Sequence, residues 1–256
     1  MKKIFASIRN NVIEKQSQII SENRSISETD LQKVPKLIAN YLRIAGVLEK
    51  PIEWNADIEW AESSLILKIG DKPRAMTTQH FISNNPVTRL MYMKIQGMQF
   101  TGIDVYHNGK GKMKGKLFGL FNIINSEGIN MDISELITIF SEFSILNSFF
   151  LSQNIYYEEI DKNSIKAIFT DNDIKVSGIF TFDDQGLISK FETNERFRDI
   201  GNGESELTPF QVNIKSYGLQ NNYLIPKEVS ASWIIDNKEF EYFKGKINNI
   251  IYNQIK

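Results

Sequence analysis

The feature that most constrains the fold of this chain is the order in which helix-like and strand-like patterns of apolar residues follow one another along the sequence. Helical spacing of apolar side chains is confined to residues 1–46 and to a segment at about 132–151, whereas the other residues carry strand patterns. Residues 52–60 alternate strictly between apolar and polar side chains, which is typical of an antiparallel strand with one buried face. Strands and helices do not alternate regularly, so the chain is predicted to be α+β and not a parallel α/β fold.

Turn residues divide the extended regions into hairpins. Asn108–Gly109 is the strongest of these signals, because both residues accept the left-handed backbone of a two-residue hairpin turn. After residue 153 such turns recur roughly every 9 to 20 residues, which predicts an antiparallel meander. Together these patterns predict one large curved antiparallel sheet, a half-open barrel, with N-terminal helices and one apolar helix across its concave face. The first strands are expected at about 64–69, 74–83, 89–97, 100–107 and 112–124.

The two helical regions differ in character. Residues 1–46 are predicted to be a helical segment packed on a body of residues 47–256, which contains the inserted helix 132–151, within a single domain overall. In that helix Asp132 and Glu135 match a capping box, and apolar residues then cover most of its circumference. A helix of this kind is either buried on nearly all sides or covers something apolar.

Composition limits the chemistry of the chain. Its 256 residues include no cysteine and two histidines, His80 and His107, which excludes disulfides, thiolate metal sites and sites with three imidazoles. Neither histidine lies in a metal-binding motif, so no cofactor and no metal are expected. The near balance of 30 basic and 31 acidic residues argues against a nucleic-acid partner.

The first residues of the chain allow two interpretations. Lys2 and Lys3 resemble the start of a signal peptide, but polar residues interrupt the apolar run that should follow. No stretch is long enough to span a membrane, so a soluble, cytoplasmic protein is expected. The alternative is that residues 1–20 form a basic amphipathic helix that contacts a membrane surface, although docking on the protein's own body explains the pattern more simply.

Three charged residues near the end of a predicted strand are the best candidates for polar chemistry. In the strand predicted from Leu187 to Arg198, Glu195 shares a face with apolar residues, and a buried carboxylate must be paired or protonated. Glu195 is therefore the best acid–base candidate, although a structural ion pair or hydrogen bond is the simpler explanation. Arg196 and Arg198 could clamp a carboxylate or phosphate, or neighbouring carboxylates could bind them.

Several ordered motifs carry a family resemblance. They are Val34–Pro35, Tyr41–Leu42–Arg43 with Gly46, Asp104-x-Tyr106-x-x-Gly109-x-Gly111-x-Met113, Glu195–Arg196–Phe197–Arg198, Gly218, Ile225–Pro226, Trp233, Phe240 and Tyr242. From about residue 34 to 253 the chain resembles a bacterial family of unknown function, and this resemblance implies no established activity. The long strands and apolar helix are similar to periplasmic lipoprotein carriers of the Lol type, which implies a half-open antiparallel barrel that cradles acyl chains. Pro209–Phe210 departs from the family pattern, in which tryptophan is expected after the proline.

These observations lead to one leading hypothesis and two alternatives. The chain is predicted to be a non-catalytic protein that binds a lipid-like, hydrophobic or amphipathic small molecule between sheet and helix, where flexible and aromatic side chains are abundant. The first alternative is an enzyme that uses Glu195 with Arg196, Arg198 or His107 in a small polar cleft. The second is an interaction module that contacts a membrane peripherally through residues 1–20. The residues predicted to line the ligand site are Tyr92, Phe100, His107, Phe140, Phe143, Glu195, Arg196, Arg198, Trp233 and Tyr242.

Overall fold

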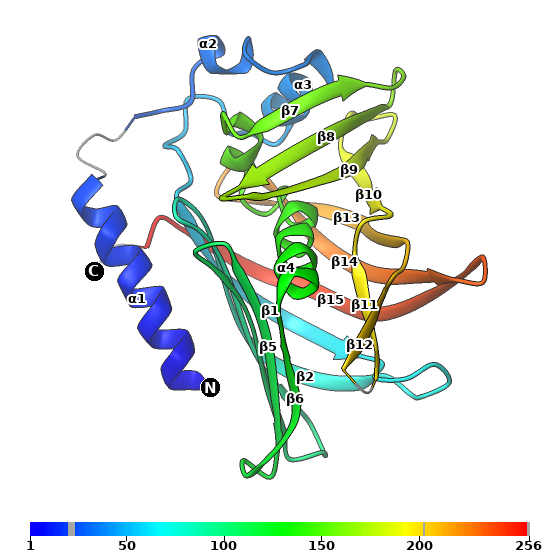
Figure 1. The fold of residues 1–256 in the computed structure, drawn as a ribbon. Coiled ribbons are helices and arrows are strands. Elements are labelled where there is room, and N and C mark those ends of the chain that lie inside the picture. Colours follow the sequence, from blue (N-terminus) through cyan, green and yellow to red (C-terminus); the bar gives the residue numbers. More distant parts are fainter. Residues whose placement is uncertain (20–23, 202, 255–256) are drawn as a thin grey trace.

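One strongly curved antiparallel sheet dominates the molecule (Figure 1). The computed structural model describes residues 1–19, 24–201 and 203–254. In this part of the chain, thirteen strands pair in the order β6-β5-β4-β3-β2-β1-β15-β14-β13-β10-β9-β8-β7. The strands are β1 (Asn55–Leu65), β2 (Arg74–Asn84), β3 (Val87–Ile95), β4 (Phe100–His107), β5 (Lys110–Leu117), β6 (Phe121–Glu127), β7 (Ile155–Glu159), β8 (Ser164–Asp171), β9 (Ile174–Phe182), β10 (Ile188–Thr193), β13 (Phe210–Gln220), β14 (Tyr223–Ile235) and β15 (Lys238–Tyr252).

The sheet joins two meanders and stays open. Strand β1 pairs antiparallel with β15, so the first six strands and the later strands form one continuous surface. Strands β6 and β7 are its two edges. The predicted α+β class, with a large unclosed antiparallel sheet, is therefore confirmed, whereas the division into a segment 1–46 and a body 47–256 within one domain stays a prediction.

Turn residues set the hairpins as predicted in most places. Asn108 and Gly109, with φ of 52° and 71°, form the turn between β4 and β5. The strand predicted at 112–124 is wrong, because Phe118 and Gly119 also take positive φ and separate β5 from β6. The unbroken run of apolar residues around Phe118 contains no signal for this turn other than the glycine.

The helix across the concave face is shorter than predicted. It comprises α4 (Ile129–Ser141) and, after a break, the 3-10 helix η1 (Asn147–Leu151), in place of one helix over 132–151. The predicted capping box is also wrong. Helix α4 follows Gly128, which has no side chain to cap it, and Asp132 lies within its first turn.

Asp132 instead attaches the start of α4 to the sheet. Its carboxylate accepts hydrogen bonds from the Gly111 backbone N–H (2.7 Å) and from Lys110 Nζ (2.9 Å) on β5. Glycine is required at this contact, because a Cβ on Gly111 would lie 2.3 Å from the Met131 carbonyl oxygen. The Lys-Gly alternation of β5 therefore lets α4 lie directly on the strand.

A solid aromatic core surrounds the end of α4. Phe140 and Phe143 are fully buried, with ring centroids 5.0 Å apart. Phe143 also stacks on Phe149, with ring centroids 4.4 Å apart and nearly parallel planes. The rings that complete this core are Phe150, Phe169, Phe180 and Phe191. Here the apolar helix covers closely packed aromatic side chains.

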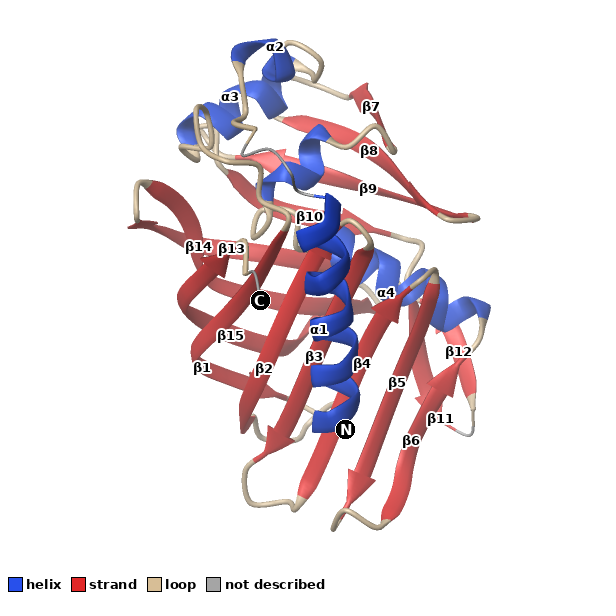
Figure 2. Cartoon of the chain, turned by 90° about the vertical axis from the view of Figure 1, so that its left-hand side faces the viewer, coloured by secondary structure: helices blue, strands red, loops and turns tan. Residues whose placement is uncertain are grey.

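The N-terminal helices lie on different parts of the sheet. Helix α1 (Lys2–Ile19) lies on the convex face, where Phe5, Val12 and Ile13 pack on a cluster from β2 to β4 (Figure 2). The helices α2 (Glu28–Leu31) and α3 (Lys36–Ile44) follow, and α3 packs on the main core.

The apolar side of α1 is thus occupied by the protein's own sheet. Arg9 also forms an ion pair with Asp57 of β1, which fixes the helix further. Residues 1–19 are therefore docked on the protein's own body, and peripheral membrane contact through residues 1–20, of which residue 20 lies outside the described residues, stays a prediction. No helix in the described part of the chain is long and apolar enough to cross a membrane.

A short hairpin leaves the sheet between β10 and β13. It consists of β11 (Phe197–Gly201) and β12 (Glu204–Leu207), which pair only with each other. The strand predicted from Leu187 to Arg198 is therefore wrong, because the chain turns away from the sheet after Thr193. This departure decides which side chains meet at the candidate site, since Arg196 lies inside the turn.

Candidate ligand-binding cavity

A cavity of about 1080 Å³ lies between the concave face of the sheet, α4 and the β11–β12 hairpin. Strands β1 to β6 and β13 to β15 contribute its floor and walls. Its volume is at the upper end of what small-molecule sites in proteins enclose. Its wall has two regions, one lined mainly by apolar side chains and the other by charged ones.

Strand β3 shows the change in character most directly. Alternate side chains of a strand point to one face, so Arg89, Met91 and Met93 line the cavity in succession at steps of about 7 Å. On β4, Asp104 lies opposite Met91 and Gly102 lies opposite Met93. The lining of the cavity therefore changes from charged at Arg89 to apolar at Met93, with Met91 and Asp104 side by side where the two regions meet.

A group of methionines is prominent in the apolar region. We call Met76, Met91, Met93 and Met113 the methionine wall. The first three are buried and pack in one cluster with Ile95 and Phe100. Methionine is flexible and polarisable, which suits contact with ligands of varied shape. The side chains that extend this wall are Trp60, Leu65, Leu67, Ile69, Ile124 and Phe243.

The charged region has a buried arginine at its centre. We call Arg89, Asp104, Glu135, Glu142 and Arg196 the charged band. The Arg89 side chain is only 5% exposed, and its Nε lies 3.0 and 2.9 Å from the two carboxylate oxygens of Glu142. Its Nη1 lies 3.5 Å from a Glu135 oxygen and 3.9 Å from an Asp104 oxygen. Three carboxylates thus share one guanidinium.

These carboxyl groups respond differently to their surroundings. Burial raises the pKa of Glu135 to about 8, with a further contribution from the charge of Asp104, although Arg89 and Arg196 lower it. Burial also raises the pKa of Asp104. For Glu142, burial raises the pKa, but the charges of Arg89 and His80 and the hydrogen bonds from both side chains together lower it to about 2. At neutral pH, Glu142 is therefore the permanent partner of Arg89, and Glu135 holds a proton.

His80 lies beside this band. Its Nε2 is 3.3 Å from a Glu142 oxygen, and its ring stacks on Trp60 at 6.0 Å between centroids. No group of three or more His, Asp or Glu side chains among the described residues is arranged to hold a metal ion. Within the band, Arg89, Asp104, Glu135 and Glu142 form an ionic network that joins the sheet to α4 and to the residue that follows it.

Arg196 enters the same cavity from the β10–β11 turn. Its guanidinium lies 4.1 Å from the Phe210 ring centroid and 4.8 Å from that of Trp233. Its two terminal nitrogens donate hydrogen bonds to Tyr242 Oη (2.9 Å) and Thr138 Oγ1 (3.0 Å). The charge is fixed in position by two rings and two hydroxyl groups.

The structure divides the predicted site residues into three groups. Arg196, Arg198, Trp233 and Tyr242 line the large cavity. Glu195 lines a separate, smaller pocket. The residues that line neither are Tyr92, Phe100, His107, Phe140 and Phe143.

Each residue of the last group has another role in the fold. Tyr92 lies on the convex face beneath α1, with Lys2 5.5 Å from its ring centroid. Phe100 is buried behind the methionine wall, and Phe140 belongs to the aromatic core. His107 is half-buried, and its Nδ1 lies 2.9 Å from Thr88 Oγ1. Burial lowers the pKa of His107, aided by the charge of Lys15.

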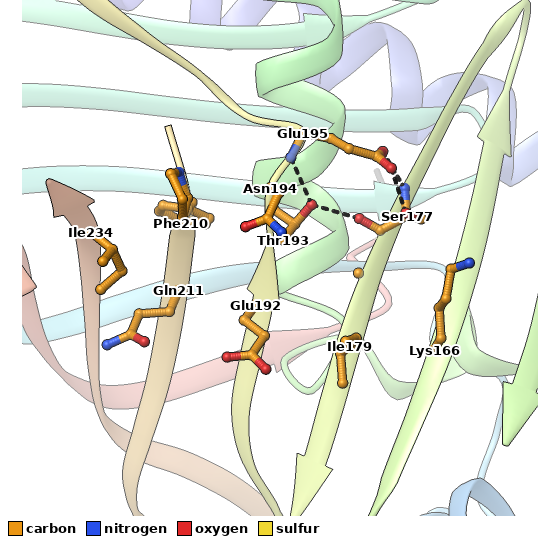
Figure 3. Close-up of a pocket in the computed structure, with 12 residues that line it drawn as sticks. Lys166, Ser177, Ile179, Glu192, Thr193, Asn194, Glu195, Phe210, Gln211 and Ile234 are labelled. Carbon is orange, nitrogen blue, oxygen red and sulfur yellow. Dashed lines mark hydrogen bonds between the residues drawn. The ribbon is translucent and has the colours of Figure 1, made fainter. Parts of the chain in front are cut away.

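The smaller pocket measures about 400 Å³ and lies between β9, β10 and β13 (Figure 3). Here the Glu195 carboxylate accepts hydrogen bonds from the Ser177 backbone N–H (2.7 Å) and Oγ (2.5 Å). Arg198 forms its ion pair with Glu206 on β12. Glu195, Arg196 and His107 therefore do not meet in one cleft, and the arrangement required for the predicted enzyme is not found.

Most of the charged band was not predicted from the sequence. Arg89, Asp104, Glu135 and Glu142 were not among the predicted site residues, although the sequence contains two signals for them. Arg89 interrupts a run of apolar residues in a strand that is buried on both faces. On α4, a polar stripe recurs at helical spacing amid apolar residues, and its members are Ser134, Glu135, Thr138, Ser141 and Glu142.

A family model described as "Family of unknown function (DUF6544)" matches residues 24–245. The chain belongs to this family. The predicted membership in a family of unknown function is thus confirmed for most of the chain. No curated protein matches it.

Solved structures of similar outline exist. A domain described as an outer membrane lipoprotein-sorting protein from Vibrio parahaemolyticus is 10% identical, with a TM-score of 0.45, over 78% of this chain and 85% of that chain. A DUF1329 family protein from Desulfovibrio piger is 8% identical, with a TM-score of 0.44, over 90% and 94%. A LolA superfamily protein from Nitrosomonas europaea is 10% identical, with a TM-score of 0.32, over 82% and 90%. We infer no function from these likenesses.

Proposed function

We propose that this protein binds a hydrophobic or amphipathic, lipid-like small molecule in the concave cavity and does not transform it. The observation that carries the proposal is the pairing of a methionine wall with a charged band in one large cavity. An amphipathic molecule would place its apolar part along Met91 and Met93 and its polar end near Arg89 and Arg196. The expected cytoplasmic location stays a prediction.

The contrast between the cavity and the aromatic core supports this proposal. The end of α4 packs against Phe169, Phe180 and Phe191 with ring distances of 5 to 6 Å, so the fold is able to fill its interior. The void next to the methionine wall is therefore not a result of loose packing throughout the molecule. A cavity that is kept beside a dense core is typical of a binding site.

The separation of the polar groups argues for binding over catalysis. Glu195 is held by Ser177 in a different pocket from Arg196. In the cavity itself, the carboxylate of lowest pKa, Glu142, is bound by Arg89 and is not free to move a proton.

Two neighbouring positions on β13 provide the test. Val212 points into the cavity, and Asn213, the next residue, points to the other face of the sheet and lines neither pocket. Val212→Trp would fill part of the void, and Asn213→Trp is the matched control. Protein purified without detergent is analysed by native mass spectrometry, and uptake of the fluorescent dye Nile red is measured.

We expect wild-type protein and Asn213→Trp to carry a lipid-like molecule and to bind the dye. We expect Val212→Trp to lose both while it keeps its unfolding transition. Wild-type protein that neither carries an apolar molecule nor takes up the dye would contradict the proposal, as would equal dye binding by both variants.

A further inference from the structure

Among the three arginines that line the cavity, Arg196 differs from the other two in forming no ion pair with a described carboxylate. In the described part of the chain, no carboxylate oxygen lies within 4.0 Å of its guanidinium, whereas Arg89 and Arg198 are both in ion pairs. Its Nε is buried and has no hydrogen-bond partner among those residues. A partly buried guanidinium without an anion loses some of its hydration and gains little in return.

The position of Arg196 is nevertheless fixed. Phe210 and Trp233 are in cation–π contact with the guanidinium, and Tyr242 and Thr138 accept hydrogen bonds from two of its nitrogens. All four of these residues line the cavity. None of them neutralises the charge, so the cavity presents a guanidinium that is held in position without a carboxylate in direct contact.

The nearby carboxyl groups leave this charge available. Glu142 is bound through both oxygens by Arg89. Glu135, with its pKa raised to about 8 by burial, is mainly protonated at neutral pH. Burial also raises the pKa of Asp104, although the charges of Arg89 and Arg196 oppose this shift. A protonated carboxyl group can donate a hydrogen bond to an incoming anion.

We propose that Arg196 binds the anionic head group of the cavity ligand, a carboxylate or a phosphate at the end of an apolar chain. This inference rests on the proposed function, because it assigns the polar end of the same ligand. The chain would extend from Arg196 along the methionine wall. A planar guanidinium held against aromatic rings suits a carboxylate or phosphate better than a flexible ammonium does.

Three probes of equal chain length distinguish the contribution of the head group to the affinity from that of the apolar tail. Dodecanoic acid, 1-dodecanol and dodecylamine are compared by displacement of Nile red from the wild-type protein at pH 7. We expect the acid to bind at least tenfold more tightly than the alcohol and the amine to bind most weakly. This comparison needs no variant, so a folding defect cannot obscure it.

Two substitutions of Arg196 then assign the preference to this side chain. We expect Arg196→Gln to bring the affinity for the acid to within threefold of that for the alcohol, with the alcohol unchanged. Arg196→Lys should restore part of the preference. Arg74→Gln, an exposed arginine on β2 that does not line the cavity, should leave the preference as in the wild type.

The outcomes distinguish the two proposals. If acid and alcohol bind equally to the wild type, or if Arg196→Gln weakens all three probes alike, the head-group assignment fails and the proposed function stands. If the amine binds most tightly, the carboxylates select the ligand, and the assignment also fails. If no probe displaces the dye and the purified protein carries no apolar molecule, the proposed function fails and the assignment fails with it.

Discussion

Glu53 is a buried carboxyl group without a basic partner, and its removal should change how stability depends on pH. The residue is fully buried just before β1. Its Oε2 accepts a hydrogen bond from the Ser148 backbone N–H at 3.2 Å, and its Oε1 has no partner among the described residues. Burial raises its pKa to about 8 from an ordinary value of 4.5, although hydrogen bonds from Ser148 and Asn147 oppose the shift.

The sign of the effect follows from proton binding. Between pH 4.5 and 8 the folded protein holds a proton on Glu53 that the unfolded chain releases, so the free energy of unfolding falls as pH rises. Each pH unit in this interval removes about 1.4 kcal/mol, which gives a loss of about 5 kcal/mol above pH 8. Glu53→Gln keeps the shape and removes the titration. We therefore expect the variant to match the wild type near pH 5 and to be more stable by several kcal/mol at pH 9.

Urea unfolding followed by tryptophan fluorescence at each pH unit from 5 to 9 measures this difference. Glu135 contributes a similar pH dependence to both proteins, since its pKa is also raised to about 8, and it cancels when the two are subtracted. Glu59→Gln, at an exposed position on β1, is the matched control. A difference between Glu53→Gln and the wild type that is the same at every pH would refute the reasoning.

Three further substitutions test the packing around α4. Phe143→Trp should cost about 1 to 3 kcal/mol of stability by overpacking and leave dye binding intact, because Phe143 lies in the solid core; lost binding with unchanged stability would contradict this. Gly111→Ala should destabilise the protein and weaken dye binding, because its Cβ would displace Met131 and α4, and dye titration with urea unfolding would show both. Arg89→Met should cost about 3 to 5 kcal/mol by leaving Glu142 unpaired, and the added change Glu142→Leu should recover most of this in urea unfolding.

The hairpin pattern of this fold is readable from the sequence because turn chemistry is local. Asn108–Gly109 fixes a turn whatever surrounds it, and strands at 74–83 and 100–107 follow within one or two residues of the structure. The turn at Phe118–Gly119 was missed because apolar residues there face solvent, with Phe118 61% exposed. The position of this turn depends on the lengths of β5 and β6, and these are set by pairing across the sheet and not by the residues of the turn itself.

The site was harder to predict because it depends on which strands meet across the cavity. Arg196 and Tyr242 were named from the sequence, but their contact joins residues 46 positions apart and requires the β11–β12 hairpin to leave the sheet. Tyr92 was predicted to line the site because the alternation of side chains along a strand shows which residues share a face of the sheet. It does not show which of the two faces is the concave one. The packing of α1 on the face that carries Tyr92 makes this face the convex one, and no local sequence pattern predicts where α1 packs.

The two faces of α4 explain how a dense core and a cavity coexist in one molecule. One face carries Phe140 and packs as tightly as any protein interior. The other carries Glu135, Thr138 and Glu142, which would be costly in a solid core because each requires a polar partner. Their partners are Arg89 on the sheet and Arg196 on the turn, and neither arginine could reach them across a layer of packed apolar side chains. The polar stripe of α4 is therefore compatible with this fold only where the sheet and the helix stand apart, which is where the cavity lies.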